Sequence, residues 1–191
     1  RYVTSAMGLF EHHFGRRCDG GQFPLMKKLS AHVTLVAIDV CRPTNLIHST
    51  GRAGADQLKA LGDMLTHASL SSQFVILALH YGLLRHDGRR DRPSHRLTDD
   101  RELQQLIDRS DVHLDIVVHG HLHRPYVVRT QRRVTICAGS ATDLHTACGY
   151  NIYHIDAQNH RLRIERRNWS VVENRYFFDV TSSLNQTLQT R

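Results

Sequence analysis

Three histidines have the residue type and spacing of a metal site. His121 and His123 stand two residues apart in a turn that begins with Gly120 and follows an apolar run, and His80 ends another such run. Neutral imidazole nitrogens are ligands for zinc, manganese and iron. A His-x-His pair alone is more often part of a surface loop, but both placements directly after apolar runs favour a shared cavity. The sequence therefore predicts that the three side chains meet at a metal site.

The elements that must position these histidines alternate along the chain. Continuous apolar runs predict buried strands, and apolar residues at helical spacing predict helices between them. The expected strands cover 32–40, 73–79 and 114–118, and the expected helices cover 54–67 and 98–110, the second with Thr98 as its N-cap. This alternation predicts a largely parallel sheet whose ligands lie outside the carboxyl ends of the strands.

The rest of the chain has a different pattern. Short strand-like segments separated by turn residues are typical of antiparallel hairpins. They cover 126–129, 133–138, 151–155 and 161–167. The expected fold class is therefore α/β with a second, more antiparallel sheet. The polar residues 180–191 show no pattern and are expected to form a flexible tail.

Composition limits the classes of protein that this chain can represent. The 191 residues are 40% hydrophobic and 23% charged, which is typical of a globular domain. No apolar run approaches the roughly 18–20 residues of a membrane span. The four cysteines are widely spaced with no C-x-x-C, which favours free thiols and a cytoplasmic protein. A net charge of +7 permits phosphorylated ligands or nucleic acid without demonstrating either.

The strand-end histidine and the Gly-His-x-His pattern together resemble the last two motifs of the calcineurin-like metallophosphoesterase superfamily. The matching segments are Phe74–His80 and Val117–Pro125. Two further segments are similar to parts of the same family: Leu35–Asp39 to the strand before its loop and helix, and Ala138–Thr142 to a turn after its Gly-His-x-His motif. The resemblance covers roughly residues 20–170.

This resemblance implies a four-layer α/β/β/α sandwich and a centre of two divalent ions, manganese, iron or zinc. It implies that His80 and His121 bind one ion and that His123 binds the other. In such hydrolases the ions lie about 3.5–4 Å apart and clamp the phosphate of a monoester or diester. The expected partner is a phosphorylated small-molecule substrate, with nucleic acid less favoured and no membrane.

The family's earlier motifs do not occur in order in this sequence. They supply the bridging aspartate, an asparagine ligand and the catalytic histidine, so no catalytic residue is assigned within the chain and these groups are expected upstream. Residues 1–179 are expected to form the C-terminal portion of a phosphoesterase domain, followed by the tail at 180–191. The interpretation predicts a truncated domain that is inactive alone.

An arginine-rich loop, residues 85–96, follows the first histidine of the motif. Arg89 and Arg90 are expected to bind substrate phosphates, with Arg124 similarly placed after the Gly-His-x-His motif. The competing interpretation is a solvated loop, which most charge runs are. Three function classes stay open: a metallophosphoesterase, a nuclease of the same superfamily, and a non-enzymatic remnant or scaffold.

Overall fold

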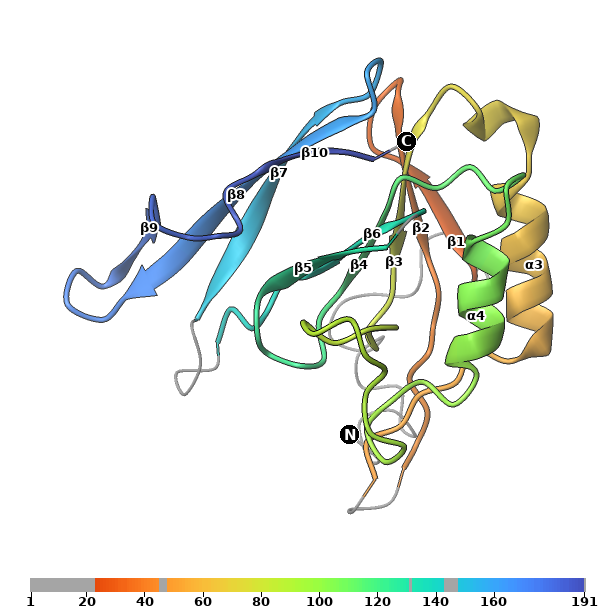
Figure 1. The fold of residues 1–191 in the computed structure, drawn as a ribbon, viewed down its shortest axis with the longest axis horizontal. Coiled ribbons are helices and arrows are strands. Elements are labelled where there is room, and N and C mark those ends of the chain that lie inside the picture. The colour runs from red at the N-terminus through yellow and green to blue at the C-terminus, as the bar shows by residue number, and fades with distance from the viewer. Residues whose placement is uncertain (1–22, 45–47, 131, 143–147, 191) are drawn as a thin grey trace.

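A six-stranded sheet forms the centre of the molecule (Figure 1). The computed structural model describes residues 23–44, 48–130, 132–142 and 148–190. The strand order is β1-β2-β3-β4-β6-β5, with β2, β3, β4 and β6 parallel and the two edge strands antiparallel. The strands are β1 Leu25–Lys28, β2 Val33–Ala37, β3 Phe74–Ala78, β4 Ile116–His119, β5 Tyr126–Arg129 and β6 Val134–Cys137. The carboxyl ends of the parallel strands therefore share one edge, as the sequence predicts.

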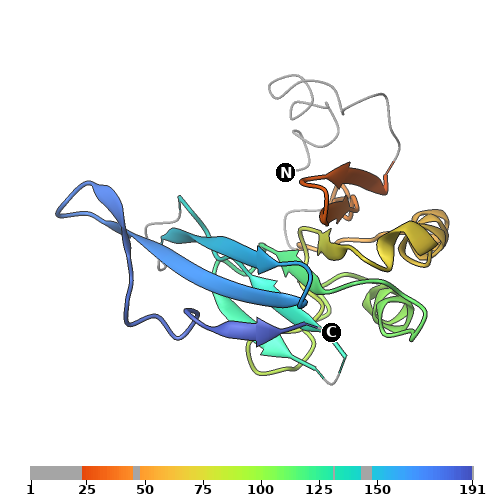
Figure 2. The same ribbon diagram turned by 90° about the horizontal axis from the view of Figure 1, so that it is seen from above.

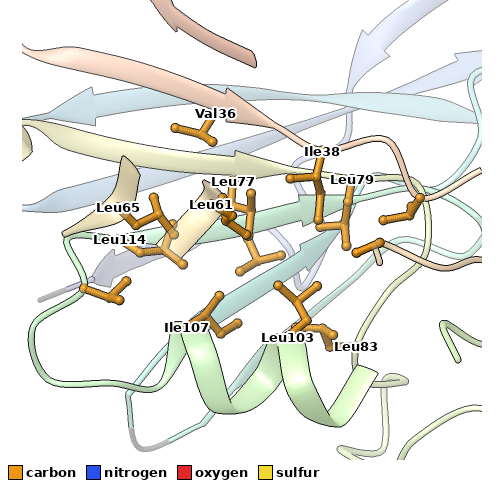
Figure 3. Packing of buried hydrophobic residues seen from close by; sticks show 14 of the residues in the cluster. Val36, Ile38, Leu61, Leu65, Leu77, Leu79, Leu83, Leu103, Ile107 and Leu114 are labelled. Atoms are coloured by element: carbon orange, nitrogen blue, oxygen red, sulfur yellow. The ribbon is translucent and has the colours of Figure 1, made fainter. Parts of the chain in front are cut away.

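Two helices, α3 (Ala55–Leu65) and α4 (Asp100–Ile107), cover one face of this sheet, and a short 3-10 turn (Ala68–Leu70) follows α3. Their apolar residues recur at helical spacing, so one stripe of each helix faces the strands. Leu61 and Leu103 are fully buried in the same cluster as Leu77 of β3 (Figure 3). The predicted amphipathic helices are thereby confirmed.

A second sheet covers the opposite face, so the described residues form three layers, helices, sheet and sheet (Figure 2). Its strands are β7 Gly149–Asp156, β8 Arg161–Ser170 and β10 Thr187–Gln189, in the order β10-β8-β7, with β9 Arg175–Phe178 paired to the far end of β8. Leu162 and Ile164 of β8 pack against Phe74, Ile76 and Ile116 of the first sheet. The structure is thus α/β with a second, antiparallel sheet.

The outer face of β8 is charged. Glu165 accepts contacts from Arg163 and Arg167 on its own strand and from His154 on β7. A sheet face covered by helices is normally apolar, whereas alternation of apolar and charged residues indicates a solvated face. Within the part of the chain that the structure describes, the fourth layer implied by the family resemblance is not present.

The expected flexible tail at 180–191 contains a strand instead. Residues Thr187–Gln189 form β10, which pairs with Arg161–Arg163 of β8. Leu188 is 6% exposed and joins the core between the two sheets. The sequence pattern missed this strand because only Leu188 of the three residues faces the core.

A buried carboxylate fastens this end of the chain to the first sheet. Asp115 is fully buried; its Oδ2 accepts the backbone N–H of Val75, and its Oδ1 accepts from His160 Nδ1 at 2.8 Å and from Thr190 Oγ1 at 3.0 Å. His160 lies between β7 and β8, and Thr190 follows β10. One side chain therefore joins both sheets.

The start of α4 also differs from the prediction. Asp99, not Thr98, is the N-cap, and its carboxylate accepts the backbone N–H groups of Ala53 and Gly54 before α3. The Thr98 hydroxyl donates to the Gly51 carbonyl. Both side chains therefore join the N-terminal end of α4 to the segment that precedes α3.

None of the described helices has the length and apolar character to cross a bilayer.

Candidate metal centre

His80 and His121 come together at the carboxyl edge of the parallel strands. Each lies two residues beyond a strand end, His80 after β3 and His121 after β4. Their ring centroids are 5.2 Å apart with the planes at 72°. Two imidazoles bound to one ion through bonds of about 2.0–2.1 Å have ring centres roughly 5 Å apart. The pair therefore has the separation that one ion requires.

Tyr81 and the 85–96 loop orient the His121 ring. Tyr81 is 3% exposed, and its ring centroid lies 4.2 Å from that of His121 and 5.0 Å from that of His80. His121 Nε2 donates to the carbonyl oxygen of His95 at 3.0 Å. A metal-ligating imidazole commonly donates its other N–H to a carbonyl, which fixes its tautomer. The sequence reasoning missed Tyr81, although its position directly after a strand-end histidine is a usable signal.

The backbone of the Gly-His-x-His turn is left-handed at both histidines. The φ angles are 45° at His121 and 52° at His123. Such conformations cost about 1–3 kcal/mol for non-glycine residues and cluster at functional sites. His121 is half-buried beside Tyr81, whereas His123 is exposed. The turn thus separates the environments of its two histidines.

His119, the last residue of β4, lies buried under the site. Its ring packs so closely on Gly82 that a Cβ at that position would lie 2.4 Å from His119 Cε1. Its Nε2 lies 3.4 Å from the hydroxyl of Tyr126. Burial, with a smaller contribution from the neighbouring histidines, lowers the pKa of His119 to about 4. His119 is therefore neutral at pH 7, and its ring packs against the backbone at Gly82, just after His80 and Tyr81.

Imidazole is a suitable type of ligand for a divalent ion, but the described residues place too few donors together to complete a site. Across residues 23–44, 48–130, 132–142 and 148–190, no three or more His, Cys, Asp or Glu side chains cluster closely enough to hold a metal ion. Two imidazoles, those of His80 and His121, are the adjacent donors. Oxygen ligands with negative charge must complete any centre that holds two dications close together.

The three arginines expected to bind substrate have different surroundings. Arg89 is exposed, and its backbone N–H donates to Asp87 within the loop. Arg90 instead pairs through two nitrogens with Asp100, the first residue of α4, whose side chain is 3% exposed. That guanidinium is paired with a buried carboxylate, which gives Arg90 a structural role, and its binding of substrate stays a prediction.

Arg124 does line a hollow beside the candidate centre. The hollow has a volume of about 340 Å³ and lies between the 85–96 loop and the residues after His121. Its lining consists of Arg85, His86, Asp91, Arg92, His95, Leu122, Arg124 and Tyr126. Three arginines in one hollow favour anion binding. Arg85 and Arg92, rather than Arg89 and Arg90, are therefore the loop arginines at this place.

Comparisons with known proteins give distant structural likenesses only. No protein-family model and no curated protein matches the chain. Solved structures with a related arrangement include GAP50, the anchor in the inner membrane complex of Plasmodium, at 12% identity and a TM-score of 0.43 over 87% of this chain and 52% of that one. A candidate 5'-nucleotidase from Staphylococcus aureus has 10% identity and a TM-score of 0.40, over 87% of this chain and 29% of that one.

A third similar structure is Vps29 from Entamoeba histolytica in complex with zinc. It has 13% identity and a TM-score of 0.30, over 76% of this chain and 96% of that one. The chain spans about half the length of GAP50 and less than a third of the nucleotidase. No activity is assigned from likenesses at these values.

Proposed function

We propose that this chain carries the histidine side of a metal-dependent phosphoesterase site. His80 and His121 hold one divalent ion, manganese, iron or zinc, and His123 belongs to a second. The observation that carries the proposal is the 5.2 Å separation of the His80 and His121 rings at the carboxyl edge of the parallel strands. Open α/β sheets bind their ligands at that edge.

The residues around this place have two roles: some orient the His121 imidazole, and others bind the substrate. The ring of Tyr81 and the carbonyl of His95 hold the His121 imidazole in one orientation. Arg85, Arg92 and Arg124 bind the phosphate group of the substrate in the adjoining hollow. A divalent ion bound by His80 and His121 would supply positive charge that polarises a phosphoryl oxygen. The substrate is a phosphorylated small molecule in this proposal.

The donors among the described residues are too few for a complete centre of two ions. The imidazoles carry no charge that offsets repulsion between two dications. We therefore expect one weakly held ion and no turnover of a model phosphodiester. A non-enzymatic metal-binding or scaffold role is the second candidate, and the incomplete donor set among the described residues favours it.

Metal titration followed by calorimetry tests the proposal. Zinc and manganese should bind the purified chain with a stoichiometry of about one, and His80→Ala and His121→Ala should each weaken binding at least ~10-fold. His32→Ala, an exposed histidine before β2 at the other edge of the sheet, is the matched control and should change nothing. Equal binding in all variants would overturn the site.

Hydrolysis assays separate the function classes. Bis(p-nitrophenyl) phosphate and a single-stranded DNA oligomer are the two substrates, each with and without added manganese. Two tightly held ions with turnover of the small diester would show that the centre is complete. Preferential cleavage of the DNA oligomer would replace the small-molecule proposal with a nuclease. Metal binding without any turnover supports the incomplete centre.

A further inference from the structure

A second hollow, separate from the candidate metal centre, lies at the opposite edge of the central sheet. It has a volume of about 510 Å³. Its lining consists of Arg109, Ser110, Val112, His113, Arg129, Thr130, Arg132, Arg133, Val134, Gln189 and Thr190. Cavities of about 300–1,000 Å³ are typical of small-molecule sites. Four arginines and a histidine give this one a strongly basic lining.

The topology places these residues together. Arg129 ends β5, and Arg132 and Arg133 precede β6, which runs parallel to β4. Arg109 follows the end of α4. Because β4 and β6 begin at this edge and His121 follows the end of β4, the hollow and the candidate metal centre lie at opposite ends of the same strands.

Backbone carbonyls hold three of the guanidinium groups. Arg133 donates to the carbonyls of Ile107 at 2.6 Å and Arg109 at 3.3 Å. Arg132 donates to the carbonyl of Asp108 at 2.9 Å. Arg129 donates to the carbonyl of Gln189 at 3.0 Å. A carbonyl fixes the position of a guanidinium without neutralising its charge.

Part of this arrangement has a purely structural explanation. Carbonyls at the end of a helix lack partners within the helix, and basic side chains near that end bind them favourably. Arg133 and Arg132 serve α4 in this way. The fourth arginine, Arg109, is paired through two nitrogens with the carboxylate of Asp111. Capping explains why Arg132 and Arg133 are ordered, and a contact with a carbonyl does not remove the positive charge of a guanidinium.

Arg129 and Arg132 are the residues best suited to receive a ligand. Both are exposed, and each uses one terminal nitrogen in its carbonyl contact. A guanidinium has five N–H donors in a planar fork that matches phosphate oxygens. The positions of these two groups are set before a ligand arrives, so less side-chain entropy is lost on binding.

We propose that this hollow binds the phosphate groups of a small phosphorylated molecule, independently of the histidine site. The chemistry is recognition of a multiply charged oxyanion by fixed guanidinium groups. A concave lining of this size suits a nucleotide, whereas a nucleic-acid backbone needs an extended basic surface. The site is thus an anion site distinct from the proposed metal centre.

Calorimetry in EDTA with ATP and with inorganic phosphate as separate probes tests the inference, since EDTA removes any ion from the histidines. We expect ATP to bind the unmodified chain, and the Arg129→Gln/Arg132→Gln variant to bind it at least ~10-fold more weakly. Arg101→Gln, an exposed arginine at the start of α4, is the matched control. A His80→Ala/His121→Ala variant should bind ATP normally, so failure of the metal centre does not affect this result.

A second variant keeps all the carbonyl contacts intact. Ser110→Glu adds a negative charge to the lining and should abolish ATP binding, whereas Ser110→Ala should not. Thermal melts of every variant verify folding. Inorganic phosphate binding as tightly as ATP would identify a free-phosphate site of the same chemistry. Undiminished ATP binding in both charge variants, or tighter arginine-dependent binding of a DNA oligomer, would overturn the inference.

Discussion

The carboxylate of Asp115 and the imidazole of His160 lie 2.8 Å apart although 45 residues separate them in the sequence. Asp115 lies directly before β4, and His160 lies directly before β8 of the second sheet. The carboxylate also accepts from Val75 and Thr190, and each of these three partners is remote from it in the sequence. This side chain is therefore a principal link between the two sheets.

Replacement of Asp115 should destabilise the protein severely. Asp115→Ala leaves the N–H of Val75, the ring of His160 and the hydroxyl of Thr190 without their acceptor. Removal of one partner from a buried charged network costs about 3–5 kcal/mol. Urea unfolding followed by circular dichroism measures the loss. Asp111→Ala, in an exposed pair with Arg109, is the control and should have a far smaller effect.

The pKa of His119 predicts how stability depends on pH. Burial lowers this pKa to about 4, whereas an unfolded histidine titrates near 6.5. Between these values the unfolded chain binds the extra proton, so the stabilising contribution is complete above pH 6.5 and is lost as the pH falls toward 4. The loss attributable to His119 amounts to about 3 kcal/mol.

Urea titrations in EDTA at several pH values measure this effect. His119→Gln removes the titrating group, so the free energy of unfolding of that variant should fall less between pH 6.5 and 4 than that of the unmodified protein. His67→Gln, at an exposed histidine, is the matched control and should retain the original pH dependence. Parallel curves for the unmodified protein and the His119 variant would contradict the assignment.

Neighbouring arginines should behave differently when replaced. Arg90→Gln removes the partner of the buried Asp100 carboxylate and should lower the free energy of unfolding by about 2 kcal/mol, as expected for a partly buried charged hydrogen bond. Arg96, whose Nε lies 4.0 Å from the same carboxylate, limits the loss. Arg89→Gln changes an exposed side chain and should leave the thermal midpoint unchanged. Equal midpoints for both variants would contradict a structural role of Arg90.

Tyr81 should affect metal affinity through His121. Tyr81→Leu removes the ring that packs 4.2 Å from the imidazole and should weaken zinc binding about 10-fold, a typical effect for residues that orient a ligand. Tyr81→Phe keeps the ring and should preserve zinc affinity. A thermal melt of each variant separates this effect from loss of folding. Zinc affinity that follows the hydroxyl instead of the ring would refute the packing argument.

Local patterns were sufficient to predict β2, β3, β4 and the two covering helices, whereas β1 was not predicted, and β5 and β6 belong to the first sheet instead of the expected second one. Buried parallel strands are continuous apolar runs, and the Phe74–Leu79 run carries that information within itself. The meeting of His80 and His121 also follows from local pattern, because strands of a parallel sheet end at one edge. The exposure of His123 could not be predicted in this way, because it depends on a left-handed backbone that the sequence does not specify.

Contacts between remote segments were the features that the sequence could not supply. The role of Arg90 depends on Asp100, which the fold places beside the loop. The strand at Thr187–Gln189 forms because β8 offers it a free edge, not because its own residues favour a strand. The arginines around the second hollow come from two segments, because Arg109 follows α4 whereas the other three lie at the end of β5 and just before β6, and only the fold brings the two segments together.

The contact between Asp115 and Thr190 spans 75 residues. The entropy lost on closing such a loop must be supplied before the contact contributes anything, and chains rich in contacts of this range fold slowly. The parallel core around β3 and β4 is available to form earlier, because its strands are linked through single helices. Until the second sheet packs on it, the inner face of the first sheet, including Phe74 and Ile116, is exposed to solvent. Refolding at high protein concentration thus competes with association through this temporarily exposed face.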